Sequence, residues 1–264
     1  MKWQMRRPAL FTIALLAAAC AAPRAAPGDP ADWIGRASFV FTGSVDSIGT
    51  TPETALLSEA DAVIVRIETV HEKPASVRLS EGETVAVQGG GAESLKPGTR
   101  ATFYATGEAY GRTLALRAVG YEVDDGPIEA HAAKVKMLRS AANDAGLRAR
   151  AHSAAAVVVG HVTSVQAARE SNAIDSEHDP EWHVAMLDVE EGLKGAKSGE
   201  NLRVRFAASL DLTWARSPKL RADQRGLFLL RKPSDSDDYL LVDPDDLLAV
   251  DQAERVRALT AGGR

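Results

Sequence analysis

The chain has 264 residues, and its 31 lysines and arginines against 36 aspartates and glutamates leave a formal net charge of −5. A net-acidic chain is a poor binder of nucleic acid and of anionic lipid head groups, because Lys and Arg supply most of that affinity. The single cysteine, Cys20, excludes an intrachain disulfide and a two-cysteine redox or zinc site.

Residues 1–19 are typical of a bacterial export signal. Lys2, Arg6 and Arg7 precede the apolar run "PALFTIALLAAA". This run is shorter than the roughly 20 apolar residues that a transmembrane helix needs, and no later segment approaches that length. We therefore expect residues 1–19 to be removed, which leaves a mature chain that is soluble or tethered by a lipid.

Cys20 ends the segment "LLAAAC", which resembles the lipobox of bacterial lipoproteins. The resemblance implies that Cys20 is lipidated and becomes the first residue of the mature chain. The box prefers leucine three residues before the cysteine, where this chain has Ala17. The alternative is ordinary cleavage near Ala19 or Ala22, which gives a secreted or periplasmic soluble protein. With Ala21 next to a lipidated Cys20, we expect the periplasmic side of the outer membrane in a Gram-negative cell.

Residues 20–32, "CAAPRAAPGDPAD", are rich in Ala, Pro and Gly and show no hydrophobic period. Such a composition is typical of a flexible tether. We expect it to separate the folded part of the chain from the membrane.

The rest of the chain repeats itself, which predicts a tandem duplication. We expect a first barrel at 33–124 with a helix at 125–150, and a second barrel at 151–247 with a helix and tail at 248–264. Gly43 corresponds to Gly160 and Glu68 to Glu190. The paired segments are 33–48 with 148–165, 61–73 with 182–195, 84–88 with 202–206, 95–107 with 220–232, 114–123 with 238–244, and 128–138 with 249–259.

Within each copy, apolar residues alternate with a period of two, which indicates half-buried strands. Gly43 and Gly160 lie inside such strands, where glycine permits a sharp bend or a close backbone approach. A bent first strand, four further short strands and a helix predict a mainly β protein with two five-stranded OB-like Greek-key barrels. A split immunoglobulin-like sandwich is the alternative architecture.

Two motifs resemble those of OB-fold modules in exported bacterial proteins related to the tissue inhibitor of metalloproteinases and to netrin-type domains. They are a strand "V-x-G-x-V" and a strand end "V-E-x-x-x-K-G". The second copy carries them at Gly160, Val162, Val189, Glu190, Lys194 and Gly195. The first copy keeps Gly43, Val45, Ile67 and Glu68, but residues 71–73 replace the turn. The disulfides and the metal-chelating N-terminal cysteine of that family have no counterpart, so protease inhibition is not carried over.

The sequence shows no constellation of catalytic residues. It lacks the G-x-S-x-G elbow, the H-E-x-x-H helix, the phosphate-binding loop and the dinucleotide fingerprint. The glycine cluster "GGGAE" (89–93) joins two predicted strands with no helix after it and is interpreted as a loop. We expect a non-enzymatic protein without a cofactor.

The segment "DSEHDPEWH" (175–183) is the candidate metal site. Its Glu177, His178, Asp179 and His183 are residue types that bind zinc and other divalent ions. The alternative is a solvated acidic loop, because the first copy has no histidine in the corresponding place.

These observations predict an envelope-anchored binding or scaffold protein. OB barrels contact partners across their central strands and adjoining loops, and the degenerate turn of the first copy predicts that only the second copy binds. The expected partner is an envelope protein first and a glycan second. A secreted inhibitor of a protease or another hydrolase and a weak metal-binding protein are the alternatives. The candidate contact residues are Trp182, Glu190, Arg203, Arg205 and Trp214, the last of which has packing over the barrel mouth as its alternative role.

Overall fold

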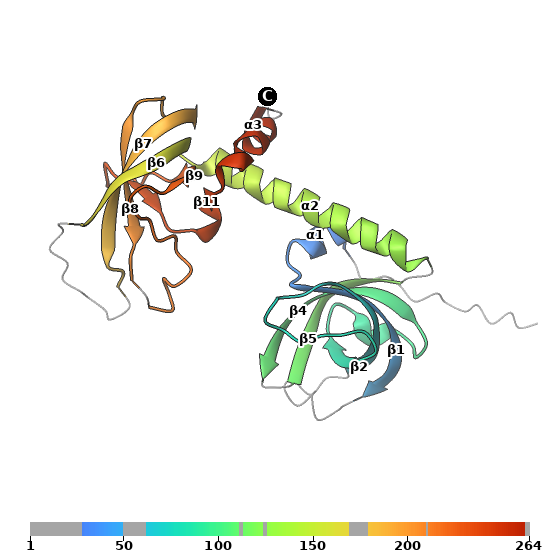
Figure 1. Cartoon of the computed structure of the whole chain (residues 1–264). Coiled ribbons are helices and arrows are strands. Elements are labelled where there is room, and N and C mark those ends of the chain that lie inside the picture. The colour runs from blue at the N-terminus through green and yellow to red at the C-terminus, as the bar shows by residue number, and fades with distance from the viewer. Residues whose placement is uncertain are drawn as a thin grey trace, which may run out of the picture. The chain divides into compact units, whose positions relative to one another are not determined.

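The computed structural model describes residues 28–49, 62–110, 113–123, 126–168, 179–209 and 211–261. The predicted export signal, Cys20, Glu177 and His178 lie outside these ranges. The chain is mainly β and divides into two compact units, Met1–Lys136 and Met137–Arg264 (Figure 1). Among the described residues, no helix combines the length and the apolar character needed to cross a bilayer.

The described part of the first unit begins with a short helix, α1 (Pro30–Ile34), which overlaps the end of the segment 20–32 expected to be a tether. The side chain of Asp29 accepts a hydrogen bond from the Ala31 N–H at 2.9 Å, and Pro30 occupies the first turn. An aspartate followed by proline is a favourable helix start, so residues 33–38 do not begin a strand as the sequence predicted. Trp33 is only 2% exposed, and its indole packs against Tyr104 with ring centroids 5.7 Å apart.

The first unit confirms the predicted closed five-stranded barrel. Its strand order is β1-β2-β3-β5-β4, and β4 pairs back with β1. Neighbouring strands are antiparallel except for β3 and β5. The rings of Phe41, Phe103 and Tyr121 are fully buried and follow one another at centroid distances of 5.4 and 6.2 Å. The elements are β1 (Phe39–Gly49), β2 (Ala62–Glu72), β3 (Thr84–Gln88), η2 (Ala92–Ser94), β4 (Arg100–Tyr110) and β5 (Thr113–Val123).

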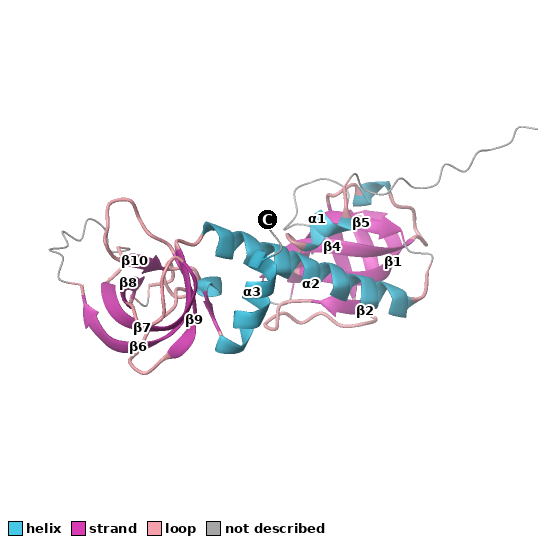
Figure 2. Cartoon of the chain, turned by 90° about the horizontal axis from the view of Figure 1, so that it is seen from above, coloured by secondary structure: helices cyan, strands magenta, loops and turns pink. Residues whose placement is uncertain are grey.

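The second unit is a curved six-stranded sheet in the order β10-β8-β7-β6-β9-β11 (Figure 2). Between β9 and β10 there is one bridge, in which Arg231 and Leu240 exchange hydrogen bonds of 3.1 and 2.8 Å. The prediction of a second closed barrel is therefore met only in part. The strands are β6 (Ala156–Ala167), β7 (Trp182–Lys194), β8 (Asn201–Ala207), β9 (Arg225–Leu230), β10 (Tyr239–Leu241) and β11 (Leu247–Leu248).

The strand registers confirm the predicted correspondence between the two glycine strands. A Cβ at Gly43 would lie 2.5 Å from the Arg66 carbonyl oxygen, and a Cβ at Gly160 would lie 2.5 Å from that of Asp188. Each glycine strand also has three register shifts against its neighbour, at matching positions. These are Val40/Phe41, Thr42/Gly43 and Val45/Ser47 in β1, and Val157/Val158, Val159/Gly160 and Val162/Ser164 in β6.

Helix α2 (Ile128–Ser153) contributes its first turns to one unit and its last turns to the other. The sequence placed its end at residue 150, with fraying from Gly146, but the helix continues for three more residues. Leu147 and Ala151 are buried, and the Lys194 ammonium donates to the carbonyls of Ala151, His152 and Ala154 at 3.3, 2.6 and 2.6 Å. These bonds satisfy carbonyls that a helix C-terminus otherwise leaves unpaired.

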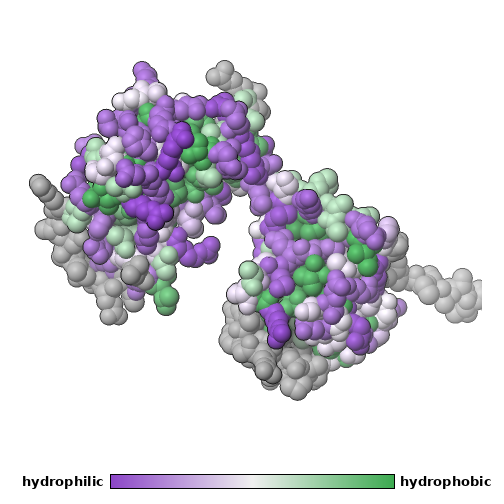
Figure 3. All heavy atoms as spheres, in the orientation of Figure 1, coloured by the Kyte–Doolittle hydropathy of each residue, from purple (hydrophilic) through white to green (hydrophobic). Residues whose placement is uncertain are grey.

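The sheet of the second unit has an apolar layer on each side. The inner layer contains Val162, Leu187, Val204 and Phe228, among others. On the other side, the last turns of α2 pack with α3 (Ala253–Ala261) over part of β6 and β9. The visible surface of both units is mostly hydrophilic, with small apolar patches (Figure 3). Two short 3-10 segments, η3 (Pro244–Asp246) and η4 (Val250–Gln252), lead into α3.

Candidate binding face of the second unit

Four of the five predicted contact residues lie on one side of the second unit's sheet, and the fifth, Trp214, packs against one of them. On β7, Ala185, Leu187 and Val189 point into the inner core. Because side chains alternate along a strand, Trp182, Met186, Asp188 and Glu190 lie on the opposite side. The same alternation places Arg203 and Arg205 of β8 on that side, because Leu202, Val204 and Phe206 are core residues. Helices α2 and α3 cover part of this side. We call the part that they leave accessible the outer face.

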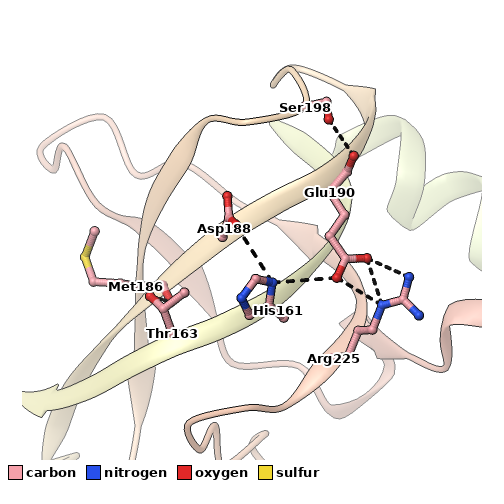
Figure 4. A network of polar contacts seen from close by, with 7 residues as sticks. All are labelled: His161, Thr163, Met186, Asp188, Glu190, Ser198 and Arg225. Atoms are coloured by element: carbon pink, nitrogen blue, oxygen red, sulfur yellow. Dashed lines mark hydrogen bonds and ion pairs between the residues drawn. The ribbon is translucent and has the colours of Figure 1, made fainter.

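One part of the outer face is a charged clasp between β7 and β9, which are the two neighbours of β6 (Figure 4). The Arg225 guanidinium lies 2.6 and 2.7 Å from Glu190 Oε2 and 3.1 Å from Oε1. These hydrogen bonds and the negative charge of Glu190 raise the pKa of Arg225. His161 Nδ1 lies 3.6 Å from Glu190 Oε1 and 4.0 Å from Asp188 Oδ2. Ser198 donates to the Glu190 carbonyl at 2.6 Å.

The first unit holds the same clasp at the corresponding positions. Arg100 Nε lies 2.6 Å from Glu68 Oε2, and Ser44, which stands where the second unit has His161, donates to the same carboxylate. Burial alone would raise the pKa of Glu68, but the hydrogen bonds from Ser44 and Arg100 outweigh it and lower that pKa. Because the clasp is present in both units, it favours a structural role for Glu190. This residue links β7 to β9, the strands on either side of the glycine strand β6.

The second part of the outer face is an aromatic cluster formed by Trp182, Trp214 and Arg205. The two indoles meet edge to face, with centroids 5.9 Å apart and an interplanar angle of 61°. The Arg205 guanidinium lies 4.5 Å from the Trp182 centroid, within range of a cation–π contact. The structure thus joins three of the five predicted contact residues into one group.

Trp214 belongs to a connection, residues 208–219, that stands where the first unit has only residues 89–94. Hydrogen bonds from Lys219 hold the described part of this connection in place. The Lys219 ammonium donates to the carbonyls of Ala207 and Trp214 at 2.7 and 2.9 Å, and its partial burial lowers the pKa of Lys219. Leu212 lies in the same connection and is 93% exposed. The connection therefore presents an apolar side chain to solvent next to an anchored tryptophan.

The remaining predicted residues do not join this cluster. Arg203 is paired with Asp238 at 2.6 Å, and that hydrogen bond and charge raise the pKa of Arg203. His183 Nε2 lies 3.0 Å from Glu181 Oε1, and its ring packs against Phe206. Of the predicted metal ligands only Asp179 and His183 are described, and the described residues contain no group of three His, Cys, Asp or Glu side chains suited to a metal ion.

The sequence reasoning missed Arg225 and Leu212. Arg225 was within reach, because the paired segments 95–107 and 220–232 both carry an arginine at the same offset, Arg100 and Arg225. Leu212 had no signal in the sequence, since an isolated leucine in a polar connection gives no indication of whether it is exposed.

The "V-E-x-x-x-K-G" motif has a structural explanation in this chain. Glu190 forms the clasp, Lys194 caps α2, and Gly195 adopts a φ of +71° where a Cβ would lie 1.9 Å from the Ala155 carbonyl oxygen. In the first unit Lys73 instead donates to the Val77 carbonyl at 2.7 Å. No protein-family model matches the chain, and no curated protein matches it either.

Proposed function

We propose that the chain is a non-enzymatic binding protein of the bacterial envelope, and that its second unit binds a protein partner through the aromatic cluster and Leu212. The observation that carries this proposal is the convergence of Trp182, Trp214 and Arg205. Tryptophan and arginine are the residue types that most often dominate the binding energy of protein interfaces. Their mutual packing holds them in place before a partner arrives, which reduces the entropy lost on binding.

Leu212 favours a protein over a glycan as the partner. A leucine that is 93% exposed, two residues before Trp214 in the chain, is the kind of apolar anchor that fits a pocket on another protein. In addition, the guanidinium of Arg205 covers one face of the Trp182 ring. That face is therefore closed to the flat stacking by which a sugar ring would contact it.

The asymmetry between the units supports binding by the second unit alone. The short connection 89–94 of the first unit has no tryptophan. The tryptophan of the first unit's described residues, Trp33, is buried against Tyr104. Lipidation at Cys20 would then keep the second unit within reach of partners in the envelope.

The proposal is tested by photocrosslinking in intact cells of the source bacterium. A photoreactive amino acid replaces Leu212, which leaves both tryptophans in place, and in a matched control it replaces Lys96, an exposed turn residue of the first unit. We expect position 212, but not position 96, to capture one envelope protein at near-stoichiometric yield, and we expect Cys20→Ser to reduce the yield. Capture of the same mixture of proteins from both positions would contradict the proposal.

A further inference from the structure

A cavity of about 510 Å³ lies in the second unit, between the last turn of α2, the end of β7 and the C-terminal half of α3. This volume is within the range of roughly 300–1,000 Å³ that is usual for small-molecule sites. The cavity is separate from the aromatic cluster and shares no residue with it.

The wall of the cavity is apolar. Val157 and Val256 belong to the buried layer between the sheet and the helices, and the half-buried side chains of Leu193 and Leu259 pack against that layer. A hydrocarbon chain placed here would extend an existing hydrophobic core. Binding would bury apolar surface of the hydrocarbon chain and of the two leucines, and the gain in free energy would be roughly proportional to the buried apolar area.

The rim of the cavity is basic, but its cations are not equivalent. Lys194 already donates three hydrogen bonds to the carbonyls at the end of α2. Arg257 is paired with Glu191 and Glu254. His152 also lines the rim, and its side chain forms no hydrogen bond or ion pair among the described residues. Arg148 is the remaining rim cation.

Arg148 has two nitrogens available for a ligand. Its Nε donates to the Leu259 carbonyl at 3.3 Å, and this is its one hydrogen bond within the described part of the chain. The nearby carboxylate on the same helix, Asp144, is taken by Arg255 at 2.6 Å. A guanidinium held by Nε alone presents its other two nitrogens in the planar geometry that matches a carboxylate.

We propose that this cavity binds a single-chain amphiphile with a terminal carboxylate. The hydrocarbon chain lies against Leu193 and Leu259, and the carboxylate pairs with Arg148 at the rim. The inference does not depend on the proposed function, because the aromatic cluster takes no part in it.

The test is calorimetric titration of the purified chain lacking residues 1–19 with laurate below its micelle concentration, and with dodecanol and dodecylammonium for comparison. We expect one laurate per chain, bound at least about tenfold more tightly than dodecanol, because a charge-assisted hydrogen bond contributes on that scale. Arg148→Ala should remove the preference for laurate and leave dodecanol binding unchanged. Arg139→Ala, which removes an arginine of α2 outside the cavity, should change neither.

A second variant tests the apolar wall independently of the charge. Leu193→Trp fills the cavity from the rim and should abolish binding of laurate and dodecanol alike, with thermal unfolding of the variant as the check on folding. Absence of saturable laurate binding would overturn the proposal. So would equal affinity for laurate and dodecylammonium, or laurate binding that Arg148→Ala and Leu193→Trp both leave intact.

Discussion

Asp246 gives the second unit a stability that depends on pH. The residue is 3% exposed, with Oδ1 3.5 Å from Arg150 Nε and Oδ2 3.5 Å from a terminal nitrogen of Arg231. Burial, and after it the charge of Asp243, raise the pKa of Asp246 from 3.8 to about 6, against the opposing effect of the two arginines. The folded state therefore binds this proton more tightly than the unfolded state does.

The direction of the effect follows from this difference in proton binding. The stabilisation of the folded state by the proton on Asp246 is fully present below about pH 4 and is lost as the pH rises through about 6. A shift of about two pH units corresponds to about 3 kcal/mol in total, of which about 2 kcal/mol falls between pH 4.5 and 7.5. Asp246→Asn carries no titrating proton. We therefore expect the variant to gain about 2 kcal/mol on the wild type between these two pH values.

The assay is urea unfolding at pH 4.5 and 7.5. After removal of residues 1–19, a Trp33→Phe background leaves Trp182 and Trp214 as the fluorescent probes, so the signal reports on the second unit. Asp235→Asn is the matched control, since Asp235 is an exposed carboxylate of the same unit that takes no part in the pKa shift of Asp246. If wild type and Asp246→Asn changed stability in parallel between the two pH values, the account of this buried carboxylate would be refuted.

Two further predictions concern the framework of the second unit. Gly160→Ala places a Cβ 2.5 Å from a backbone oxygen of β7 and should destabilise the second unit by about 1–3 kcal/mol. Gly146→Ala on α2 places a Cβ 3.6 Å from the Arg150 guanidinium, an ordinary contact distance, and should be neutral or stabilise by up to about 1 kcal/mol. Urea unfolding measures both, and equal effects would show that the close approach is not what requires glycine at position 160. Lys194→Met leaves three carbonyls at the end of α2 without their donor, so we expect a loss of about 1–3 kcal/mol and faster amide exchange in the last turn of α2; unchanged exchange there would contradict the capping role.

The correspondence between the two glycine strands was predictable from the sequence, because each strand has a glycine at the same place. Gly43 and Gly160 permit the same close approach to a neighbouring strand, and only glycine fits there. The incomplete pairing between β9 and β10 in the second sheet was not predictable from the alternation of apolar residues. The bridge at Arg231 is followed shortly by Pro233, which has no N–H to continue a ladder. Alternating residues in 238–244 look like a paired strand whether or not the preceding strand reaches them.

The sequence predicted most of the residues that belong to the candidate site, but it did not predict all the contacts between them. In the register of β7 and β8, Arg205 lies opposite Val184, which is two residues from Trp182 on the same face, so the contact between Arg205 and Trp182 is a diagonal cross-strand contact that the register allows. The contact of Trp214 depends on how a long connection folds back, and local sequence does not determine this. Glu190 and Lys194 stood out because they form a motif, yet the contacts of both are with the framework of their own unit.

The central claim is that the aromatic cluster holds the binding energy for a protein partner. The most direct measurement is the yield of the crosslink from position 212 in cells, compared between the wild type and the variants Trp182→Ala and Trp214→Ala. The account predicts that either variant lowers the yield at least tenfold, as for hot-spot residues that contribute about 2 kcal/mol or more, with the fold of the second unit unchanged by circular dichroism. A crosslink to the same partner at wild-type yield in both variants would contradict it.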